Sequence, residues 1–143
     1  MRNAYGRTQP TILILQSLGG FVGGRVGPVV RVEGGRLRGR ALGGVCPFLG
    51  VPYAAAPIGA KRFRPAAPVT SWTGVRDAVR FGATAPRPGY PPPLDRIFID
   101  PVIAGDDYLN LNIWTPHPCA SGLPVMVWIH GGAFLHGSTS PGN

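Results

Sequence analysis

The sequence predicts a fold made mainly of strands and loops. Residues 109–114 alternate Leu or Ile with Asn or Trp, the period-two pattern of a strand. Residues 123–129 form a continuous apolar run, which is typical of a central strand covered on both faces. Helix patterns are nearly absent, and 22 glycines and 17 prolines indicate many turns. The length of 143 residues suits one ordinary domain.

The chain is basic, with a net charge of +8, and Lys61 is the single basic residue that is not an arginine. The arginines are scattered between Arg2 and Arg96 and form no dense run. Nucleic-acid-binding domains gather basic residues on one face. A generally cationic, solvated surface is therefore favoured, and we expect no nucleic-acid partner.

Residues 1–27 are expected to be a poorly ordered leader, because five glycines between 19 and 27 break any helix. A secretory signal is the alternative, since an early arginine precedes the apolar run ILIL. Gln16 ends that run after four residues, whereas such signals need 7–15. We expect a cytoplasmic protein, with secretion as the alternative. No segment approaches the roughly 20 apolar residues of a membrane span, so no membrane partner is expected.

Ordered structure is expected to begin with a β-hairpin. The glycine pair at 34–35 fits a two-residue turn that needs positive φ. This register places Val32 opposite Leu37 on a buried face, and Arg31 opposite Arg38 on a solvated face.

A third strand is expected within residues 44–54, and a proline-rich stretch follows it. Prolines at 57, 65 and 68 exclude regular structure there, and Phe63 and Trp72 are expected to anchor this loop to a core. Three prolines at 91–93 indicate a stiff surface loop, with a polyproline ligand as the alternative.

The apolar run 123–129 ends at His130, which two glycines follow. Paired glycines leave successive backbone N–H groups unobstructed, and such donors can stabilise the oxyanion of acyl transfer. A plain tight turn is the alternative. Cys46 and Cys119 show no zinc-ligand spacing, and we expect free thiols, no metal and no cofactor.

Four motifs resemble, in the same order, the signatures of the type-B carboxylesterases and cholinesterases. Residues 48–54, FLGVPYA, are similar to F-x-G-I-P-Y-A, and P-x-G, R-F and a tryptophan follow at 57–59, 62–63 and 72. Residues 106–116, DDYLNLNIWTP, are similar to E-D-C-L-Y-L-N-V-W-T-P. Residues 123–138, LPVMVWIHGGAFLHGS, are similar to L-P-V-M-V-W-I-H-G-G-G-F-x-x-G-S. Together the motifs make this resemblance highly specific.

The resemblance implies an α/β fold class. Residues 28–143 would form the N-terminal portion of an α/β-hydrolase domain, which is mostly strands and loops in this part. It implies that Gly131 shapes the turn and that the N–H groups of Gly132 and Ala133 donate to the oxyanion. Ala133 stands where many members have glycine, which narrows the permitted φ. His130 is implied to be structural, because the family's catalytic histidine lies far downstream.

The resemblance also implies an ion pair between Arg62 and Asp106, which lie in motifs that are paired in the family. The family's frequent disulfide is not possible here, because Tyr108 and Ala85 stand at its two cysteine positions. Loss of both cysteines favours a bacterial-type or intracellular member over a secreted one.

The family's G-x-S-x-G elbow, acid and histidine cannot be placed in these residues; STSPG at 138–142 lacks the first glycine. We hypothesise part of a serine-type carboxylic-ester hydrolase that carries the oxyanion loop, lacks the triad and is inactive alone. Its substrate would be a small carboxylic ester, and the remainder of the hydrolase is expected outside these residues. The alternatives are a non-catalytic binding or adhesion homologue and a basic nucleic-acid-binding module.

Overall fold

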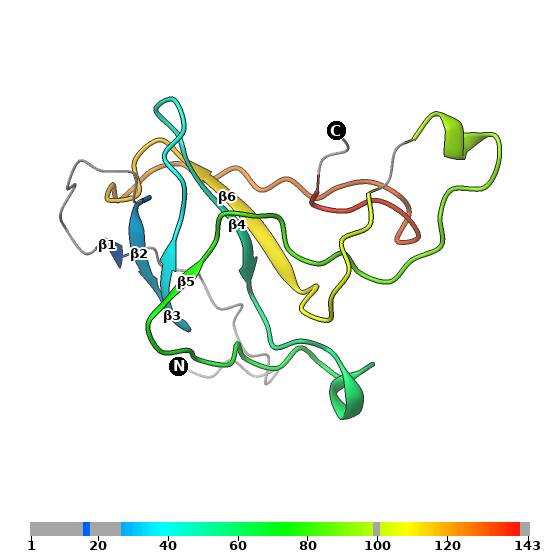
Figure 1. Ribbon diagram of the computed structural model, residues 1–143, viewed down its shortest axis with the longest axis horizontal. Helices are drawn as coiled ribbons and strands as arrows, with labels where there is room; N and C mark the ends of the chain where they lie inside the picture. The colour runs from blue at the N-terminus through cyan, green and yellow to red at the C-terminus, as the bar shows by residue number, and fades with distance from the viewer. Residues whose placement is uncertain (1–15, 18–26, 99–100, 141–143) are drawn as a thin grey trace, which may run out of the picture.

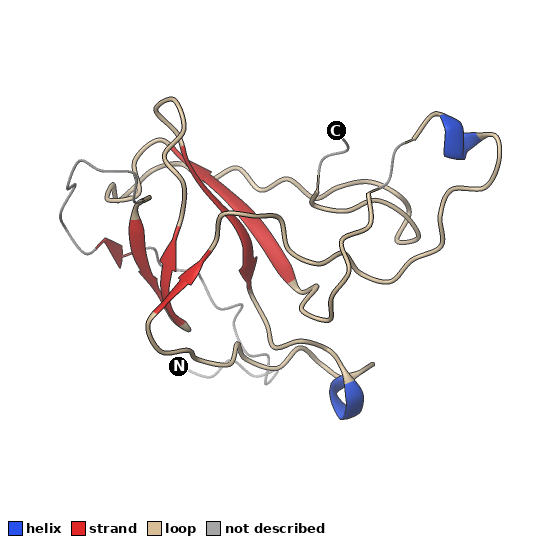
Figure 2. Cartoon of the chain, in the orientation of Figure 1, coloured by secondary structure: helices blue, strands red, loops and turns tan. Residues whose placement is uncertain are grey.

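The strands of the described residues form two small sheets (Figures 1 and 2). The computed structural model describes residues 16–17, 27–98 and 101–140. The first sheet has the strand order β1-β2-β3-β5, and the second pairs β4 with β6. The strands are β1 Gln16–Ser17, β2 Val29–Val32, β3 Gly35–Arg38, β4 Cys46–Pro52, β5 Val75–Asp77 and β6 Asn110–Thr115.

Within these described ranges the helices are two 3-10 turns, η1 Gly59–Lys61 and η2 Leu94–Arg96. The expected predominance of strands and loops is therefore confirmed. The expected leader, residues 1–27, lies almost entirely outside the described residues; of it, β1 pairs antiparallel with β2.

The hairpin forms, but its predicted register is wrong. Val30 pairs with Leu37 and Val32 pairs with Gly35, so the turn lies one residue earlier than expected. The shift preserves the buried face, because Val30 and Val32 project to the same side of β2. Arg31 pairs with Arg36 in place of Arg38.

The glycine pair is explained by the indole ring of Trp72. The Trp72 N–H donates to the Gly34 carbonyl at 2.9 Å, and its indole Nε1–H donates to the Arg36 carbonyl at 2.9 Å. A Cβ atom on Gly35 would lie 2.7 Å from the indole nitrogen, and one on Gly34 would also overlap the ring. The expected anchoring by Trp72 is confirmed by its packing on the core.

The expectation that Phe63 also anchors this loop is wrong. Its side chain is 91% exposed, and its backbone has a φ of +58°. The guanidinium of Arg62 lies over the ring, 4.9 Å from its centroid. The loop is therefore held at Trp72, and η1 projects away from both sheets (Figure 1).

The core lies where the hairpin meets β4. Phe48, Leu37, Val30 and Val51 are the largest fully buried side chains. Backbone hydrogen bonds join the two sheets as well, since the Leu49 N–H donates to the Ala78 carbonyl at 2.8 Å. Burial of these apolar groups, at roughly 25 cal/mol per Å², is the main favourable contribution to folding here.

The expected strands within 44–54 and 109–114 are confirmed as β4 and β6, which pair antiparallel with each other. Phe48 faces Ile113, and Val51 faces Leu111, with a bulge between Phe48 and Val51. Gly50 occupies the bulge with a φ of +64°, and a Cβ atom there would lie 2.9 Å from the Arg80 carbonyl oxygen. Only glycine meets both conditions.

The prediction of a central strand at 123–129 is wrong for the 143-residue chain. These residues form an extended loop without strand pairing among the described residues (orange in Figure 1). Met126 is 91% exposed and Trp128 is 84% exposed. A central strand needs hydrogen-bonding neighbours and apolar layers on its faces, and the described residues provide neither at this segment.

Two phenylalanines should differ sharply in their contribution to stability. Phe48→Ala removes a fully buried ring beside Leu37 and should lower the free energy of opening of the β2–β3 amides by about 3–5 kcal/mol. Phe63→Ala, the matched control at an exposed ring, should change it by less than about 0.5 kcal/mol. Hydrogen exchange measured by mass spectrometry reports both values. Equal effects would contradict the assigned core.

The segment 123–129 should make the 143-residue chain bind an environment-sensitive hydrophobic dye. The segment is apolar and exposed, and no Asp, Glu, Lys or Arg follows Asp107 in the sequence. The double variant Met126→Ser, Trp128→Ser should reduce dye fluorescence at least about twofold. A chain that binds no dye and melts in one sharp transition would show that this surface is covered in solution.

Candidate functional site

The paired glycines after His130 lie in a compact turn (red in Figure 1). The N–H groups of Leu135 and His136 both donate to the Gly132 carbonyl, at 2.9 and 3.0 Å. Gly132 has a φ of +113°, and a Cβ atom there would collide with the His136 carbonyl. Glycine at 132 is thus required by both the backbone angle and the space.

The next two residues are held in the left-handed region, although neither is glycine. Ala133 has a φ of +53° and Phe134 a φ of +62°. This conformation costs L-residues roughly 1–2 kcal/mol each. Such strain persists only where the surrounding structure fixes it, and it is often found at binding and catalytic sites.

Two adjacent backbone donors in this turn are free. Among the described residues, the N–H groups of Gly132 and Ala133 have no hydrogen-bond partner. Gly132 is half-buried and Ala133 is exposed. Free N–H groups on successive residues can bind an anionic oxygen.

His130 supports the turn from its start. Its Nδ1 lies 2.8 Å from the carbonyl oxygen of Gly131. Because a carbonyl only accepts, Nδ1 must carry the proton. A Cβ atom on Gly137 would lie 2.8 Å from this nitrogen, so the imidazole fills the space beside that glycine.

Asn112 on β6 ties the end of this region to the paired strands. Its Oδ1 accepts from the Gly50 N–H at 2.9 Å, and its Nδ2 donates to the Thr139 carbonyl at 2.9 Å. One amide group therefore satisfies the N–H group at the β4 bulge and holds the chain just beyond the turn. The bulge and the turn are connected through this side chain.

Asn110, two residues earlier, fixes a second loop in the same way. Its Nδ2 donates to the carbonyls of Ala83 and Asp107, each at 3.0 Å, and its buried amide leaves no room for a Cβ atom at Gly82. Neither asparagine was among the expected site residues. The sequence contains a pattern that could have indicated them. Two asparagines on one face of a strand suggest side-chain hydrogen bonds to the backbone rather than a face exposed to solvent.

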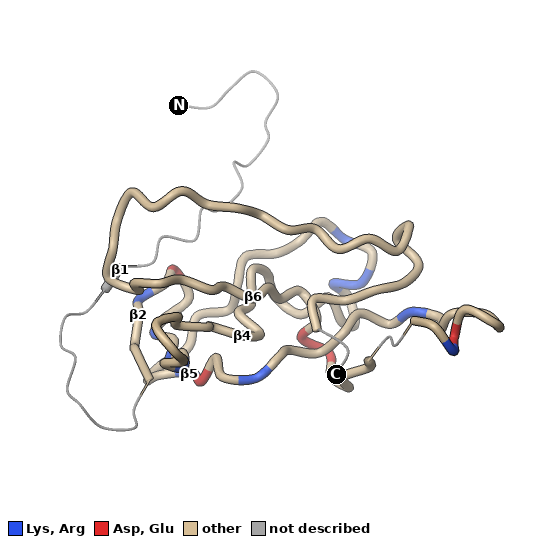
Figure 3. The backbone as a smooth tube through the Cα atoms, turned by 90° about the horizontal axis from the view of Figure 1, so that it is seen from above, with Lys and Arg blue, Asp and Glu red and all other residues tan. Residues whose placement is uncertain are grey.

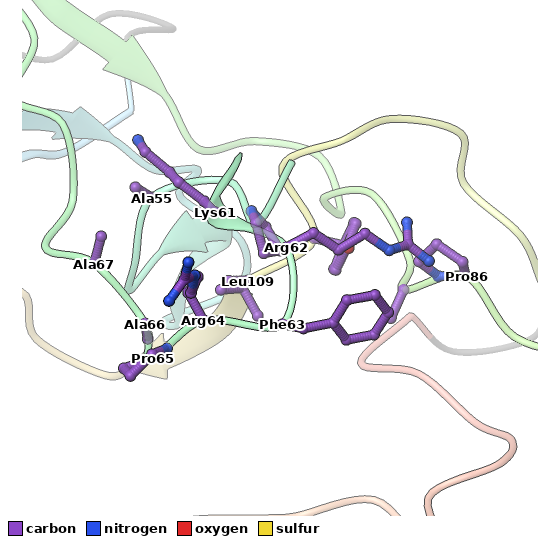
Figure 4. Close-up of a pocket in the computed structure, with 13 residues that line it drawn as sticks. Ala55, Lys61, Arg62, Phe63, Arg64, Pro65, Ala66, Ala67, Pro86 and Leu109 are labelled. Carbon is purple, nitrogen blue, oxygen red and sulfur yellow. The ribbon is translucent and has the colours of Figure 1, made fainter. Parts of the chain in front are cut away.

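The expected ion pair between Arg62 and Asp106 is wrong. Among the described residues Arg62 has no carboxylate partner, and its side chain extends along Phe63 toward Pro86 (Figure 4). The neighbouring carboxylate, Asp107, is bound instead by Arg76 of β5 at 2.9 Å.

Arg62 lines an open pocket of about 430 Å³ with mainly apolar walls. Ala85 and Tyr108, at the two positions of the family's frequent disulfide, also line this pocket. The basic residues as a whole are spread over several segments of the chain (Figure 3).

Cys46 is buried and Cys119 is exposed, and neither forms a disulfide within the part of the chain that the structure describes. Burial raises the pKa of Cys46, and the charge of Cys119 raises it further.

Within the described ranges, no group of three or more His, Cys, Asp or Glu side chains is arranged to hold a metal ion. No helix in those ranges is long and apolar enough to cross a membrane.

A sequence model described as the carboxylesterase family matches residues 26–143, the part that contains the turn and both strands of its support. The chain belongs to the carboxylesterase family. Phenmedipham hydrolase of Pseudarthrobacter oxydans is 44% identical over 113 residues, which are 78% of this chain and 23% of that protein.

Solved carboxylesterase structures share this arrangement of strands and loops. A Geobacillus stearothermophilus carboxylesterase superposes with a TM-score of 0.60 at 43% identity, over 76% of this chain and 20% of that one. A PNB esterase superposes with a TM-score of 0.66 at 36% identity, over 76% of this chain and 22% of that one. The chain thus corresponds to the N-terminal part of an α/β-hydrolase domain and spans about a fifth of the length of these proteins.

Asn112→Asp should release the turn while leaving the bulge intact. The carboxylate still accepts from the Gly50 N–H, but it faces the Thr139 carbonyl without a proton to donate. Loss of this exposed hydrogen bond should lower protection in residues 130–140 by about 0.5–1.5 kcal/mol. Hydrogen exchange on peptides from both regions measures the difference. Asn112→Ala, which loses both contacts, should expose the bulge too, and unchanged exchange at 130–140 in both variants would contradict the bridge.

Proposed function

We propose that this chain supplies the oxyanion-binding turn of a serine-type carboxylic-ester hydrolase whose catalytic triad lies outside the 143 residues. The observation that carries the proposal is the pair of free N–H groups on Gly132 and Ala133 in a strained turn of a carboxylesterase-family chain. The family match of the chain and the positive-φ conformation of the turn both support a role for Gly132 and Ala133 in binding the oxyanion.

The chemistry requires donors at the place where negative charge develops. When a nucleophile attacks an ester carbonyl, the carbonyl oxygen becomes an oxyanion in the tetrahedral intermediate. N–H groups about 2.7–3.1 Å from this oxygen stabilise it more strongly than the neutral carbonyl of the substrate. The turn would lower the activation barrier because it stabilises the oxyanion more than the substrate carbonyl. Its fixed geometry means that the donors need not move during the reaction.

Small carboxylic esters are the substrate class that these observations favour. The names phenmedipham hydrolase and PNB esterase belong to relatives of this chain and describe hydrolysis by those proteins. The free donors in the turn favour a catalytic member over a non-catalytic binding homologue, since a purely adhesive surface has no need of them.

The 143-residue chain alone should show no esterase activity. Backbone donors stabilise charge only after a nucleophile has created it, and no nucleophile elbow is present in the sequence. We expect no turnover of p-nitrophenyl esters above a denatured control and no labelling by an organophosphonate probe. A chain extended through the triad should show both. Stoichiometric labelling of a serine in the short chain would overturn the assignment.

The contribution of one donor is best isolated by replacing Ala133 with L-lactic acid in the extended chain. This change converts the N–H into an ester oxygen and leaves the side chain unchanged. Proline would not isolate the donor, because its φ near −65° is incompatible with +53° at Ala133. We expect kcat to fall about 10²–10³-fold. The same backbone change at Ala66, in an exposed loop, is the matched control, and equal rates for both variants would contradict the proposed role.

A further inference from the structure

His136 links the turn to the proline-rich loop at 86–98. Its Nδ1 lies 3.1 Å from the Pro88 carbonyl oxygen, so Nδ1 carries the proton and donates it. The imidazole stacks on Tyr90, with ring centroids 4.2 Å apart and planes 22° from parallel. Tyr90 in turn packs against Phe98, with centroids 5.1 Å apart. The side chain of His136 is thus held by a hydrogen bond and a ring stack.

The backbone of the same residue closes the turn. The His136 N–H donates to the Gly132 carbonyl at 3.0 Å, and the His136 carbonyl occupies the space where a Cβ atom on Gly132 would lie. The hydrogen bond couples the position of His136 to that of Gly132. Its side-chain contacts in loop 86–98 and its backbone contacts at Gly132 form one continuous path.

We propose that His136 is a positioning residue for the oxyanion donors, an inference that rests on the proposed function of the turn. Asn112 holds the chain at Thr139, whereas His136 holds the turn itself at Pro88 and Tyr90. Ala133 and Phe134 lie between Gly132 and His136 and are in the left-handed region. Without the His136 contacts, these two residues can relax toward negative φ, which changes the direction of the Ala133 N–H group relative to that of Gly132.

The first test measures the anchor without reference to activity. His136→Ala in the 143-residue chain should increase hydrogen exchange at least about fivefold in peptides from both 86–98 and 130–137. His136→Asn places an amide N–H near the position of Nδ1 and should retain part of the protection, whereas His136→Gln places its amide one methylene farther and should not. His117→Ala, the matched control at an exposed histidine just beyond the C-terminal end of β6, should leave both peptides unchanged. Unchanged exchange in His136→Ala, or equal loss in the Asn and Ala variants, would overturn the anchor.

The second test measures the donors in a chain extended through the triad. Misplacement of reacting groups by about 1 Å can cost up to about 10²-fold in rate. We expect His136→Ala to lower kcat about tenfold with KM within about twofold, and His136→Asn to recover part of kcat. A full-rate His136→Ala enzyme would overturn the positioning role. An unsubstituted extended chain with no esterase activity would instead contradict the proposed function, and the exchange measurements would still decide whether His136 holds the turn.

Discussion

The side-chain amide of Asn112 is the contact on which the placement of the turn depends. It accepts a hydrogen bond from Gly50 in β4 and donates one to Thr139 beyond the turn. Both partners are backbone groups, so the bridge transmits the position of the chain itself. Hydrogen bonds of this kind each contribute about 0.5–1.5 kcal/mol, but a buried partner left unpaired costs more. The Asn112 bridge therefore matters more for the position of the turn than for the overall stability of the chain.

The bridge is effective because β4 is rigid where Asn112 meets it. The bulge at Gly50 brings the backbone of β4 close to residues 80–82, and Phe48 and Val51 on either side are fully buried. Close packing on this scale leaves little freedom for movement. The segment 123–129, which leads into the turn, is exposed, and it is unpaired among the described residues. The turn is thus fixed by contacts with β6 and loop 86–98 rather than by the segment that leads into it.

The sequence pattern predicted the strands that depend on neighbouring residues, but not the contacts between residues that are far apart in the chain. Alternation predicted β6, and a strand was also expected where β4 lies; both strands have residues in the core or packed against it. The hairpin register was predicted incorrectly, since the glycines make room for Trp72, some 40 residues away, rather than forming the turn together. Residues 123–129 have the composition of a central strand, but composition cannot supply neighbouring strands. The pairing of Arg62 with Asp106 was carried over from the family, and Arg76 binds the adjacent carboxylate instead.

The candidate site, too, has features that the sequence predicted and features that it did not. The glycines at 131 and 132 and the departure at Ala133 were visible in the sequence, whereas the asparagine bridge and the docking of His136 join residues too far apart for periodicity to reveal. We infer that these contacts direct two N–H groups at one oxygen. The most direct measurement is a crystal structure of the chain extended through its triad, with a phosphonate bound covalently to the nucleophile. We expect a phosphonyl oxygen about 2.7–3.1 Å from the nitrogens of both Gly132 and Ala133, with the Asn112 bridge intact. An adduct whose oxygen is bound elsewhere, with these N–H groups facing solvent, would contradict the account.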